Sequence, residues 1–339
     1  MTAVAEAAGV SLATVSHVFN RTRHVSEVTR TRVLAAAEAL GYYDRRVQGL
    51  EETRRIVGVV VPSAASPYFG EMLEGIDAEA TRTNITLLLS MSTEDANREL
   101  RAVQALLQRD VDAIILVPSS GWRERTRPLL KNSRTAVILA DRLEDQSFDQ
   151  VGAENTHASQ AIVSHLISAG RSRIAMIGGL SGLSTSRERE EGFRLAHKKH
   201  GLIVDDALLW NGQSTVQGGM RAATQMLRTT PRPDAVFCAN NNMTLGLLAA
   251  LHKEDVGVPK DLALVSFDDL EWGDILVPGI TAVAQPFHAV GSQAVRLAVS
   301  RWLEPDRPPQ TLRLPPSIEH RESCGCELAR LGSRRKSPL

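Results

Sequence analysis

Hydrophobic and polar positions divide the chain into a short helical region and a longer region where strand and helix patterns alternate. In the first forty or so residues, apolar positions recur at helical spacing in three segments, over residues 3–8, 12–19 and 28–40. Gly9 follows the first segment, and Ser11 and Ser26 stand as N-caps before the second and third. Two short helices separated by a glycine turn predict a helix-turn-helix unit.

The second of these helices has a face that could contact DNA. It consists of Leu12, Ala13, Thr14, Ser16 and His17. The hydroxyls of Thr14 and Ser16 can bond phosphate, and His17 can reach a base edge in the major groove. The pattern alone also fits a plain three-helix bundle with these groups on a solvated face.

From residue 56 onward, strand-like runs alternate with amphipathic helical segments. The expected strands are residues 56–62, 86–90, 113–117, 136–140, 174–177, 235–239 and 262–267. The expected helices are residues 68–83, 94–108, 156–169, 186–199, 215–227 and 243–253. This alternation predicts an α/β fold with parallel sheets, and the length favours two lobes.

Parallel α/β sheets bind ligands at the carboxyl ends of their strands, and polar or aromatic residues follow several expected strands. They are Ser63, Phe69, Asp141, Arg187, Asn240 and Asp268. Such groups suit a polyhydroxylated ligand. Each also has a structural explanation. Asp268 and Asp269 could cap the next segment, and Asn240–Asn242 could be turn residues. Phe69 and Trp272 could belong to the core.

Composition adds limits to this picture. The net charge of the 339 residues is zero, so total charge does not indicate nucleic-acid binding. The first residues carry no signal-peptide pattern, and the chain is expected to be cytoplasmic. Cys324 and Cys326 form a close pair without an evident distant partner, so we expect neither a metal nor a cofactor.

Motifs of common enzymes are not evident. A Ser-Ala-Ala-Ser run follows the first expected strand of the core where a dinucleotide-binding fold would have Gly-x-Gly-x-x-Gly. Neither a phosphate-binding loop nor a Gly-x-Ser-x-Gly elbow is found. The chain is therefore not expected to be an enzyme.

The N-terminal region resembles the headpiece of the lactose-repressor (LacI) family through Val4-Ala5-Glu6-Ala7-Ala8-Gly9-Val10-Ser11-x-x-Thr14-Val15-Ser16-His17-Val18-x-Asn20. The resemblance implies phosphate contacts by Thr14 and Ser16 and base contacts near His17. It also implies a leucine wedge in the hinge, matched by Leu50. The expected DNA-binding residues are Ser11, Leu12, Ala13, Thr14, Ser16, His17, Asn20 and Leu50.

The core resembles the same family through motifs that include Val57-Gly58-Val59-Val60-Val61-Pro62, Ser186-Arg187-Glu188-Arg189 and Phe267-Asp268-Asp269. The resemblance implies a two-lobed core like a type I periplasmic-binding protein, with the effector between the lobes. The implied effector-binding residues are Ser63, Phe69, Asp141, Arg187, Asn240, Asp268, Trp272 and Gln285.

The expected domains are a headpiece over residues 1–44, a hinge over 45–55, a core over 56–326 and a solvated tail over 327–339. The N-lobe would hold about 56–150 and 285–305, and the C-lobe about 151–284 and 306–326. The resemblance also implies that the helix over residues 289–302 returns to the N-lobe and the strand over 311–314 to the C-lobe.

The resemblance implies a sequence-specific transcription regulator, expected to be a homodimeric repressor. Its operator affinity would be controlled by a sugar or sugar acid, with operator DNA as the macromolecular partner and no membrane contact. Two alternatives stay open: a purine-responsive regulator of this family, and a stand-alone sugar-binding protein without DNA function.

Overall fold

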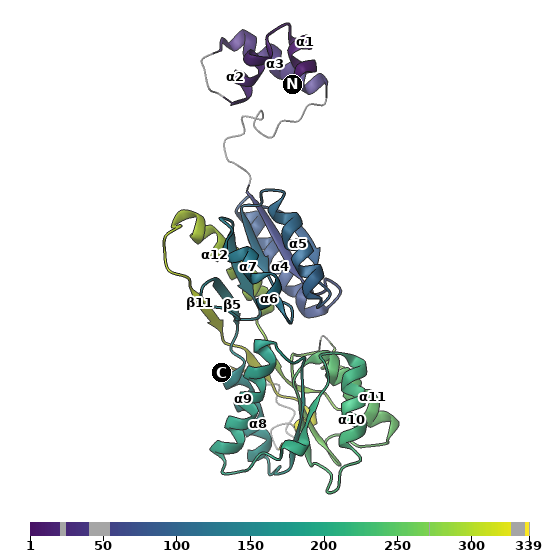
Figure 1. Cartoon of the computed structure of the whole chain (residues 1–339). Helices are drawn as coiled ribbons and strands as arrows, with labels where there is room; N and C mark the ends of the chain where they lie inside the picture. Colours follow the sequence, from purple (N-terminus) through teal and green to yellow (C-terminus); the bar gives the residue numbers. More distant parts are fainter. Residues whose placement is uncertain (21–24, 41–54, 271, 327–335, 339) are drawn as a thin grey trace. The chain divides into compact units, whose positions relative to one another are not determined.

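The computed structural model describes residues 1–20, 25–40, 55–270, 272–326 and 336–338. Its contacts divide the chain into two compact units, Met1–Arg54 and Arg55–Leu339. Figure 1 labels the principal elements of each unit.

The described residues of the first unit form three helices: α1 (Thr2–Ala8), α2 (Leu12–Asn20) and α3 (Glu27–Ala39). Val4, Val15 and Val33 are fully buried where the helices meet. Gly9 has a left-handed φ of 60°, as its place after the first helical segment predicted. The expected apolar stripe of α3 was wrong at its two ends, because Val28 is 79% and Leu40 50% exposed.

The first lobe of the second unit is built on a sheet of six parallel strands in the order β11-β5-β4-β3-β1-β2. Its strands are β1 (Ile56–Val61), β2 (Thr86–Met91), β3 (Ala113–Leu116), β4 (Ala136–Ala140), β5 (Asp149–Ala153) and β11 (Thr311–Leu314). Its helices are α4 (Pro67–Arg82), α5 (Ala96–Leu107), α6 (Trp122–Arg125), α7 (Arg127–Lys131) and α12 (Phe287–Leu303). Two apolar clusters of buried side chains pack against the strands of this sheet.

The second lobe has a seven-stranded sheet in the order β13-β12-β10-β9-β8-β6-β7. Its strands are β6 (Ile174–Gly178), β7 (Leu209–Asn211), β8 (Ala235–Cys238), β9 (Ala263–Phe267), β10 (Thr281–Ala284), β12 (Ser317–Glu319) and β13 (Lys336–Pro338). Its helices are α8 (Thr156–Ser168), α9 (Ser184–Lys199), α10 (Val216–Met226) and α11 (Asn241–Lys253), with short 3₁₀ turns at Asp206–Leu208 and Glu322–Cys324. Among the described strands of this sheet, β12 pairs antiparallel with both β10 and β13, and the other pairings are parallel, so the expectation of two largely parallel sheets is confirmed.

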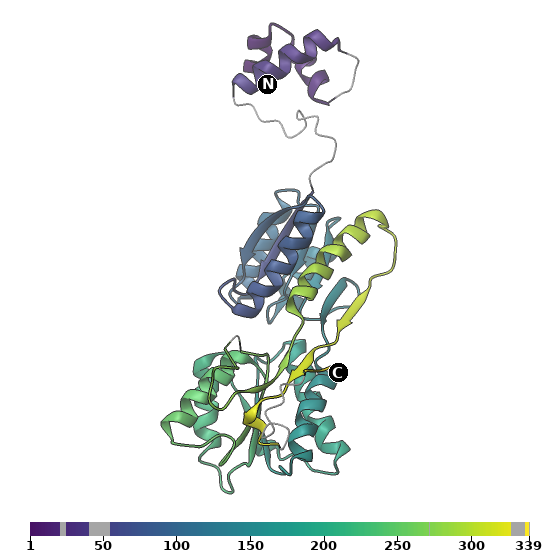
Figure 2. The same ribbon diagram turned by 180° about the vertical axis from the view of Figure 1, so that it is seen from behind.

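Helix α12 lies against α4 in the first lobe, as the view from behind shows (Figure 2). The two helices can approach closely because a glycine of α4 lies against the backbone of α12. A Cβ added at Gly75 would lie 2.0 Å from the carbonyl oxygen of His288. The hydroxyl of Ser292 donates to the Gly75 carbonyl at 3.1 Å. The chain therefore returns to the first lobe after β10 through a tightly packed helix pair.

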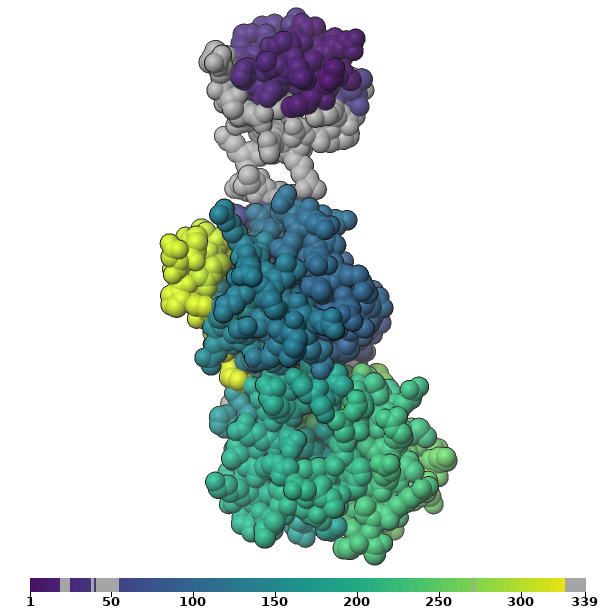
Figure 3. All heavy atoms as spheres, in the orientation of Figure 1, coloured from purple at the N-terminus to yellow at the C-terminus, as the bar shows by residue number. Residues whose placement is uncertain are grey.

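The chain passes between the lobes after β5, after β10 and between β11 and β12. The residues of α12 and the loop that follows it, yellow in Figure 3, lie beside the blue first lobe. The strand Thr311–Leu314 was expected in the second lobe, but this prediction was wrong because the strand pairs with β5 in the first lobe. Residues 317–319 then enter the second sheet, so the last crossing comes later in the chain than expected.

The expected solvated tail is also corrected in part, because Lys336–Pro338 pairs with β12 at the edge of the second sheet. Among the described residues, no helix combines the length and the apolar character needed to span a membrane.

Candidate functional site

A cavity of 610 Å³ lies between the two lobes, at the carboxyl ends of strands from both sheets. Small-molecule sites usually measure about 300–1,000 Å³. The cavity is lined by residues that follow β1, β2 and β4 in the first lobe and β6, β7, β8 and β9 in the second, together with residues of α4 and α9. This is the edge of parallel sheets at which such folds bind ligands.

In the first lobe, the cavity wall holds an Asp–Arg–Glu cluster. Arg142 is 4% exposed, and its Nη1 donates to Glu94 Oε2 at 2.9 Å and to the Pro118 carbonyl at 2.6 Å. Its Nη2 donates to the other carboxylate oxygen of Glu94. The Nε of Arg142 lies 3.6 Å from Asp141 Oδ2, beyond hydrogen-bond distance. Arg142 is thus paired mainly with Glu94, and Asp141 is only partly compensated.

The buried carboxyl of Asp141 has an altered affinity for protons. Burial, opposed by the charges of Arg142 and Arg189, raises the pKa of Asp141 from 3.8 to about 6. At neutral pH it is an ionised acceptor held away from water, which suits a ligand that brings its own hydroxyl donors.

We expect Asp141→Asn to stabilise the unliganded protein at neutral pH by up to about 3 kcal/mol. A folded pKa above the unfolded value means that the native state holds the proton more tightly. The charge therefore costs stability progressively as pH rises from 3.8 to about 6, and the full cost remains above that range. Urea unfolding at about pH 4.5 and pH 7.5 should show a gain mainly at the higher pH.

The exposed Asp77 of α4 offers a matched control, since Asp77→Asn removes one charge far from the cavity lining. A gain for Asp141→Asn that is the same at both pH values would contradict the assignment.

In the second lobe, Arg189 of α9 is fixed in the cavity wall. It is 6% exposed, and its Nε donates to Asn155 Oδ1 at 2.9 Å and its Nη1 to the Ala239 carbonyl at 2.8 Å. Its guanidinium carbon lies 3.8 Å from the centre of the Phe267 ring. The same Nη1 is 3.6 Å from Asp268 Oδ2. These contacts hold a cation beside a buried carboxylate and limit the side chain to one orientation.

Aromatic rings complete the wall from the first lobe. The ring centres of Tyr68 and Phe69 are 4.0 Å apart, and Tyr68 is also 4.9 Å from Phe287. Burial raises the pKa of Tyr68 well above 10, with a further contribution from the charge of Asp141. The Tyr68 hydroxyl therefore stays neutral and can donate a hydrogen bond at physiological pH.

Unusual backbone conformations gather in the loops around this cavity. Among the described residues, most non-glycine positions with positive φ line it: Thr93, Glu94, Asp141, Gln213, Ser214 and Asp268. Asp141 and Asp268 each follow a strand directly, with φ of 65° and 69°. Such conformations cost free energy and concentrate at ligand sites, where they fix the direction of side chains.

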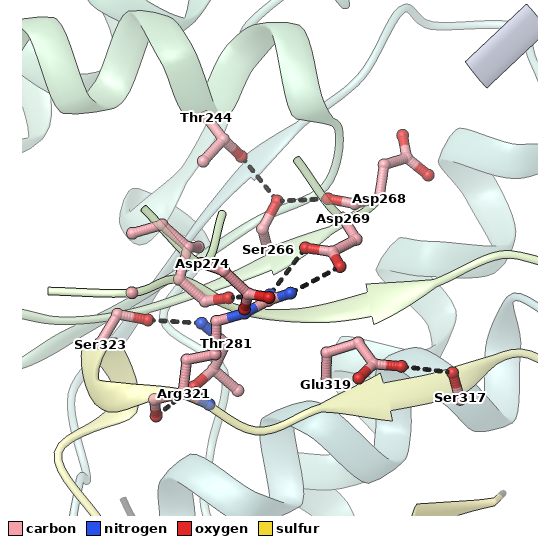
Figure 4. Close-up of polar contacts among 12 residues, drawn as sticks. Thr244, Ser266, Asp268, Asp269, Asp274, Thr281, Ser317, Glu319, Arg321 and Ser323 are labelled. Atoms are coloured by element: carbon pink, nitrogen blue, oxygen red, sulfur yellow. Dashed lines mark hydrogen bonds and ion pairs between the residues drawn. The ribbon is translucent and has the colours of Figure 1, made fainter. Parts of the chain in front are cut away.

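The neighbouring carboxylates of Asp268 and Asp269 point in different directions, and that of Asp269 pairs with Arg321 (Figure 4). Asp269 accepts from Arg321 Nη1 at 2.7 Å and from Nη2 at 2.9 Å, and Arg321 also pairs with Asp274. Asp268 accepts from the amide of Gln285 instead. Through Arg321, Asp269 connects the loop after β9 to the segment after β12. Asp268, and not Asp269, lines the interlobe cavity.

The structure brings together five of the eight predicted effector-binding residues. Ser63, Phe69, Asp141, Asn240 and Asp268 line the cavity. Asn240 is also the N-cap of α11, where its Oδ1 accepts from the Met243 amide at 3.2 Å.

The other three predictions do not fit this cavity. The side chain of Arg187 is 60% exposed and lies 4.0 Å from Glu144. It does not line the cavity, because residues two apart on a helix face different sides and Arg189 is the one that faces the cavity. Trp272 and Gln285 line a separate cavity of 1080 Å³, although Gln285 reaches Asp268 by its amide.

Sequence reasoning missed Glu94, Arg142 and Arg189. Glu94 was placed inside a helix, but α5 begins at Ala96 with Asp95 as its N-cap, and Glu94 lies in the preceding turn. The capping aspartate was the available signal. Arg189 was visible as the second arginine of its motif, and only the phase of α9 shows that it faces the cavity.

The predicted DNA-binding face lies at the start of α2. Ser11 caps this helix, with its Oγ accepting from the Thr14 amide at 3.1 Å. Leu12 is 50% exposed and Ala13 is exposed, whereas Thr14, Ser16 and His17 are half-buried. Asn20 closes α2, and Leu50 lies outside the described residues. The arrangement presents an N-terminal helix face of the kind that enters a major groove.

Comparison with known proteins gives matches along most of the chain. A family model described as "Bacterial regulatory proteins, lacI family" matches residues 1–44, and one described as "Periplasmic binding protein-like domain" matches residues 163–324. The ribose operon repressor of Escherichia coli (strain K12) is 30% identical over 324 residues, which cover 94% of this chain and 98% of that protein. Catabolite control protein A of Priestia megaterium is also 30% identical, covering 94% and 97%.

A solved structure, "transcriptional regulator CelR-cellobiose complex", superimposes with a TM-score of 0.72 at 28% identity and covers 95% of this chain and 98% of that one. A helix-turn-helix unit followed by a two-lobed core with a polar cavity defines a class of effector-responsive, DNA-binding regulators. The chain belongs to the LacI family of bacterial regulatory proteins. It is a DNA-binding transcription regulator with an effector-binding core, as predicted, and its relatives are regulators and not enzymes.

Proposed function

We propose that this regulator is a repressor whose effector is a neutral sugar bound in the interlobe cavity. The observation that supports it most is the set of buried charges there: the carboxylates of Asp141, Asp268 and Glu94 against the guanidinium groups of Arg142 and Arg189. These acceptors, with the aromatic face of Tyr68 and Phe69, match a ligand rich in hydroxyl donors and flat apolar patches.

The balance of charge favours a neutral sugar over a sugar acid. Arg142 is already committed to Glu94, and Arg189 lies beside Asp268, so neither cation is left for a ligand carboxylate. An anionic ligand would meet the charge of Asp141, which Arg142 and Arg189 compensate only in part. The names of two similar proteins, the ribose operon repressor and the CelR–cellobiose complex, point to sugars as well.

The proposed mechanism follows from the two-lobed core. Two copies associate as a homodimer in the cytoplasm and present paired headpieces to a pseudo-palindromic operator. The proposed DNA contacts are those of Ser11, Leu12, Ala13, Thr14, Ser16, His17, Asn20 and Leu50. The sugar contacts both lobes and shifts their relative orientation, and operator affinity changes by the sugar's differential affinity for the two states.

The operator and the effector class can be found together. The full chain is used to enrich binding sites from random duplex DNA, and the enriched pool is then challenged with neutral sugars, sugar acids and purines. We expect a palindrome whose occupancy responds to a neutral sugar. A response to purines alone would support the alternative of a purine-responsive regulator. If the chain binds sugar but enriches no DNA site, the result would support a sugar-binding protein without DNA function.

The residue His17 provides a test of the headpiece. We expect His17→Ala to weaken binding to the selected operator by about 10- to 100-fold, since one base contact is worth about 1–3 kcal/mol. Binding to random DNA should change little, because phosphate contacts supply it. Fluorescence anisotropy on both DNAs gives the comparison, with His200→Ala, an exposed histidine of the core, as control. An equal loss on both DNAs would contradict a base-reading role.

A further inference from the structure

Two thiols and one imidazole meet in the second lobe, outside the interlobe cavity, and a second imidazole packs against the first. The ligand atoms of His165, Cys324 and Cys326 all lie within 4.8 Å of one another, and the two sulfur atoms are 3.4 Å apart. The ring of His320 stands edge-on to that of His165, with centres 4.8 Å apart. These side chains are the usual ligands of thiophilic metal ions.

Distant segments of the chain build this cluster. His165 comes from the last turn of α8, His320 directly follows β12, and Cys324 ends a short 3₁₀ turn. Between the cysteines, Gly325 has a left-handed φ of 72°, and an added Cβ would lie 3.1 Å from the Arg171 guanidinium and from Pro259. Glycine thus allows a tight turn that turns both sulfur atoms toward His165.

Ordinary core packing explains only part of the cluster. Cys324 is 0% and Cys326 8% exposed, and buried free cysteines are common. Both histidines, however, have a buried ring nitrogen without a hydrogen-bond partner: Nε2 of His165 and Nδ1 of His320. Buried polar atoms are normally paired, so an orphaned nitrogen on the imidazole that meets two thiols needs another partner.

We propose that Cys324, Cys326 and His165 bind a thiophilic divalent cation of the zinc type, with the ring of His320 packed against that of His165. In a tetrahedral zinc site, neighbouring ligand atoms lie about 3.3–3.8 Å apart, so the present spacing needs only small side-chain movements. The ion joins α8 to the segment after β12, and its role is structural. From the sequence alone, the Cys324–Cys326 pair had no evident further metal ligand, because His165 is far from it along the chain.

The test uses the full chain without a histidine tag, kept reduced and stripped of metal with a chelator, and titrated with Co²⁺. We expect a single cobalt ion per chain, with the visible bands of tetrahedral cobalt and a near-ultraviolet thiolate-to-cobalt band. Zn²⁺ should then displace it and abolish both. At about a hundred times its Kd, Zn²⁺ should raise the unfolding midpoint by roughly 3–6 °C.

Substitutions identify the ligands. Replacing residues that only hydrogen-bond to metal ligands already weakens metal binding by about 10- to 100-fold, so Cys324→Ser or Cys326→Ser should lower the affinity for Co²⁺ by about a hundredfold or more. His165→Gln should weaken binding but keep the thiolate band. Cys238→Ser is the matched control, because Cys238 is a buried thiol of the same lobe whose Sγ donates to the Asn240 carbonyl.

The proposal is overturned if cobalt binds to the wild-type chain without a thiolate band or does not bind. It is equally overturned if Cys238→Ser loses as much affinity as Cys324→Ser. The wild-type spectrum needs no substitution, so it decides the matter even if a cysteine variant does not fold.

Discussion

Replacing Arg189 with alanine should lower the affinity of the core for its effector by about a hundredfold or more. The guanidinium of Arg189 is buried between Asn155, the Ala239 carbonyl and Asp268. Removing it leaves a buried carboxylate unpaired, which costs about 3–5 kcal/mol, and removes a fixed donor from the cavity. Isothermal titration with the effector and denaturant unfolding of the unliganded chain would separate the two contributions.

The matched control is Arg187→Ala, two positions earlier on the same helix. Its side chain is 60% exposed and outside the cavity lining, so effector affinity should stay within about twofold and stability within about 0.5 kcal/mol. Operator binding without effector should survive both substitutions. A large loss for Arg187→Ala with none for Arg189→Ala would reverse our assignment of the cavity arginine.

The second large effect should follow Gly75→Ala, which places a methyl group 2.0 Å from the His288 carbonyl oxygen. The obstacle is backbone on α12, so the helices must separate and the Ser292 bond to Gly75 is lost. Overpacking of this kind usually costs about 1–3 kcal/mol, and a contact with rigid backbone places the expected cost at about 3 kcal/mol or more. Denaturant unfolding of the purified chain measures it.

Gly70, in the same helix, provides the control. A Cβ at Gly70 meets nothing within 4 Å. Gly70→Ala should therefore be neutral or stabilise the protein by about 0.5–1 kcal/mol, because alanine is the better helix former. Equal destabilisation by both substitutions would show that the α4–α12 approach is not what requires glycine at position 75.

Local patterns predicted well those elements whose stability is local. Helices α2 and α8 begin at the predicted residues, and β4 matches its predicted range at both ends. Their signals are caps, apolar periodicity and runs of branched residues, all of which act within a few residues.

Elements that depend on distant partners were missed. The strand Asp149–Ala153 has little apolar character, and its Asp149 is buried because Arg301 and Arg307 pair with it at 2.9 and 2.7 Å. The partner of β5, β11, was placed in the second lobe from the family resemblance, and no local pattern marked β5 as the strand that it joins. A local pattern carries no information about such pairing.

The site shows the same division. Asp141 and Asp268 could be predicted because they directly follow clear strands at the ligand-binding edge. The choice between Arg187 and Arg189 depended on the rotation of α9 about its axis, and that rotation is fixed by packing against α8, where a Cβ at Gly192 would lie 2.3 Å from the Thr156 carbonyl. The apolar periodicity of the sequence did not define the rotation of α9 precisely enough to show which of the two arginines faces the cavity.

The most direct test of the account is the affinity of the full chain for its selected operator, measured with and without the neutral sugar found in the panel. We expect the sugar to change the operator affinity of the wild-type chain by about 5- to 150-fold, the range of typical allosteric coupling. For Arg189→Ala we expect no change in operator affinity at the same sugar concentration. An operator affinity that stays constant while the sugar demonstrably fills the cavity would contradict it.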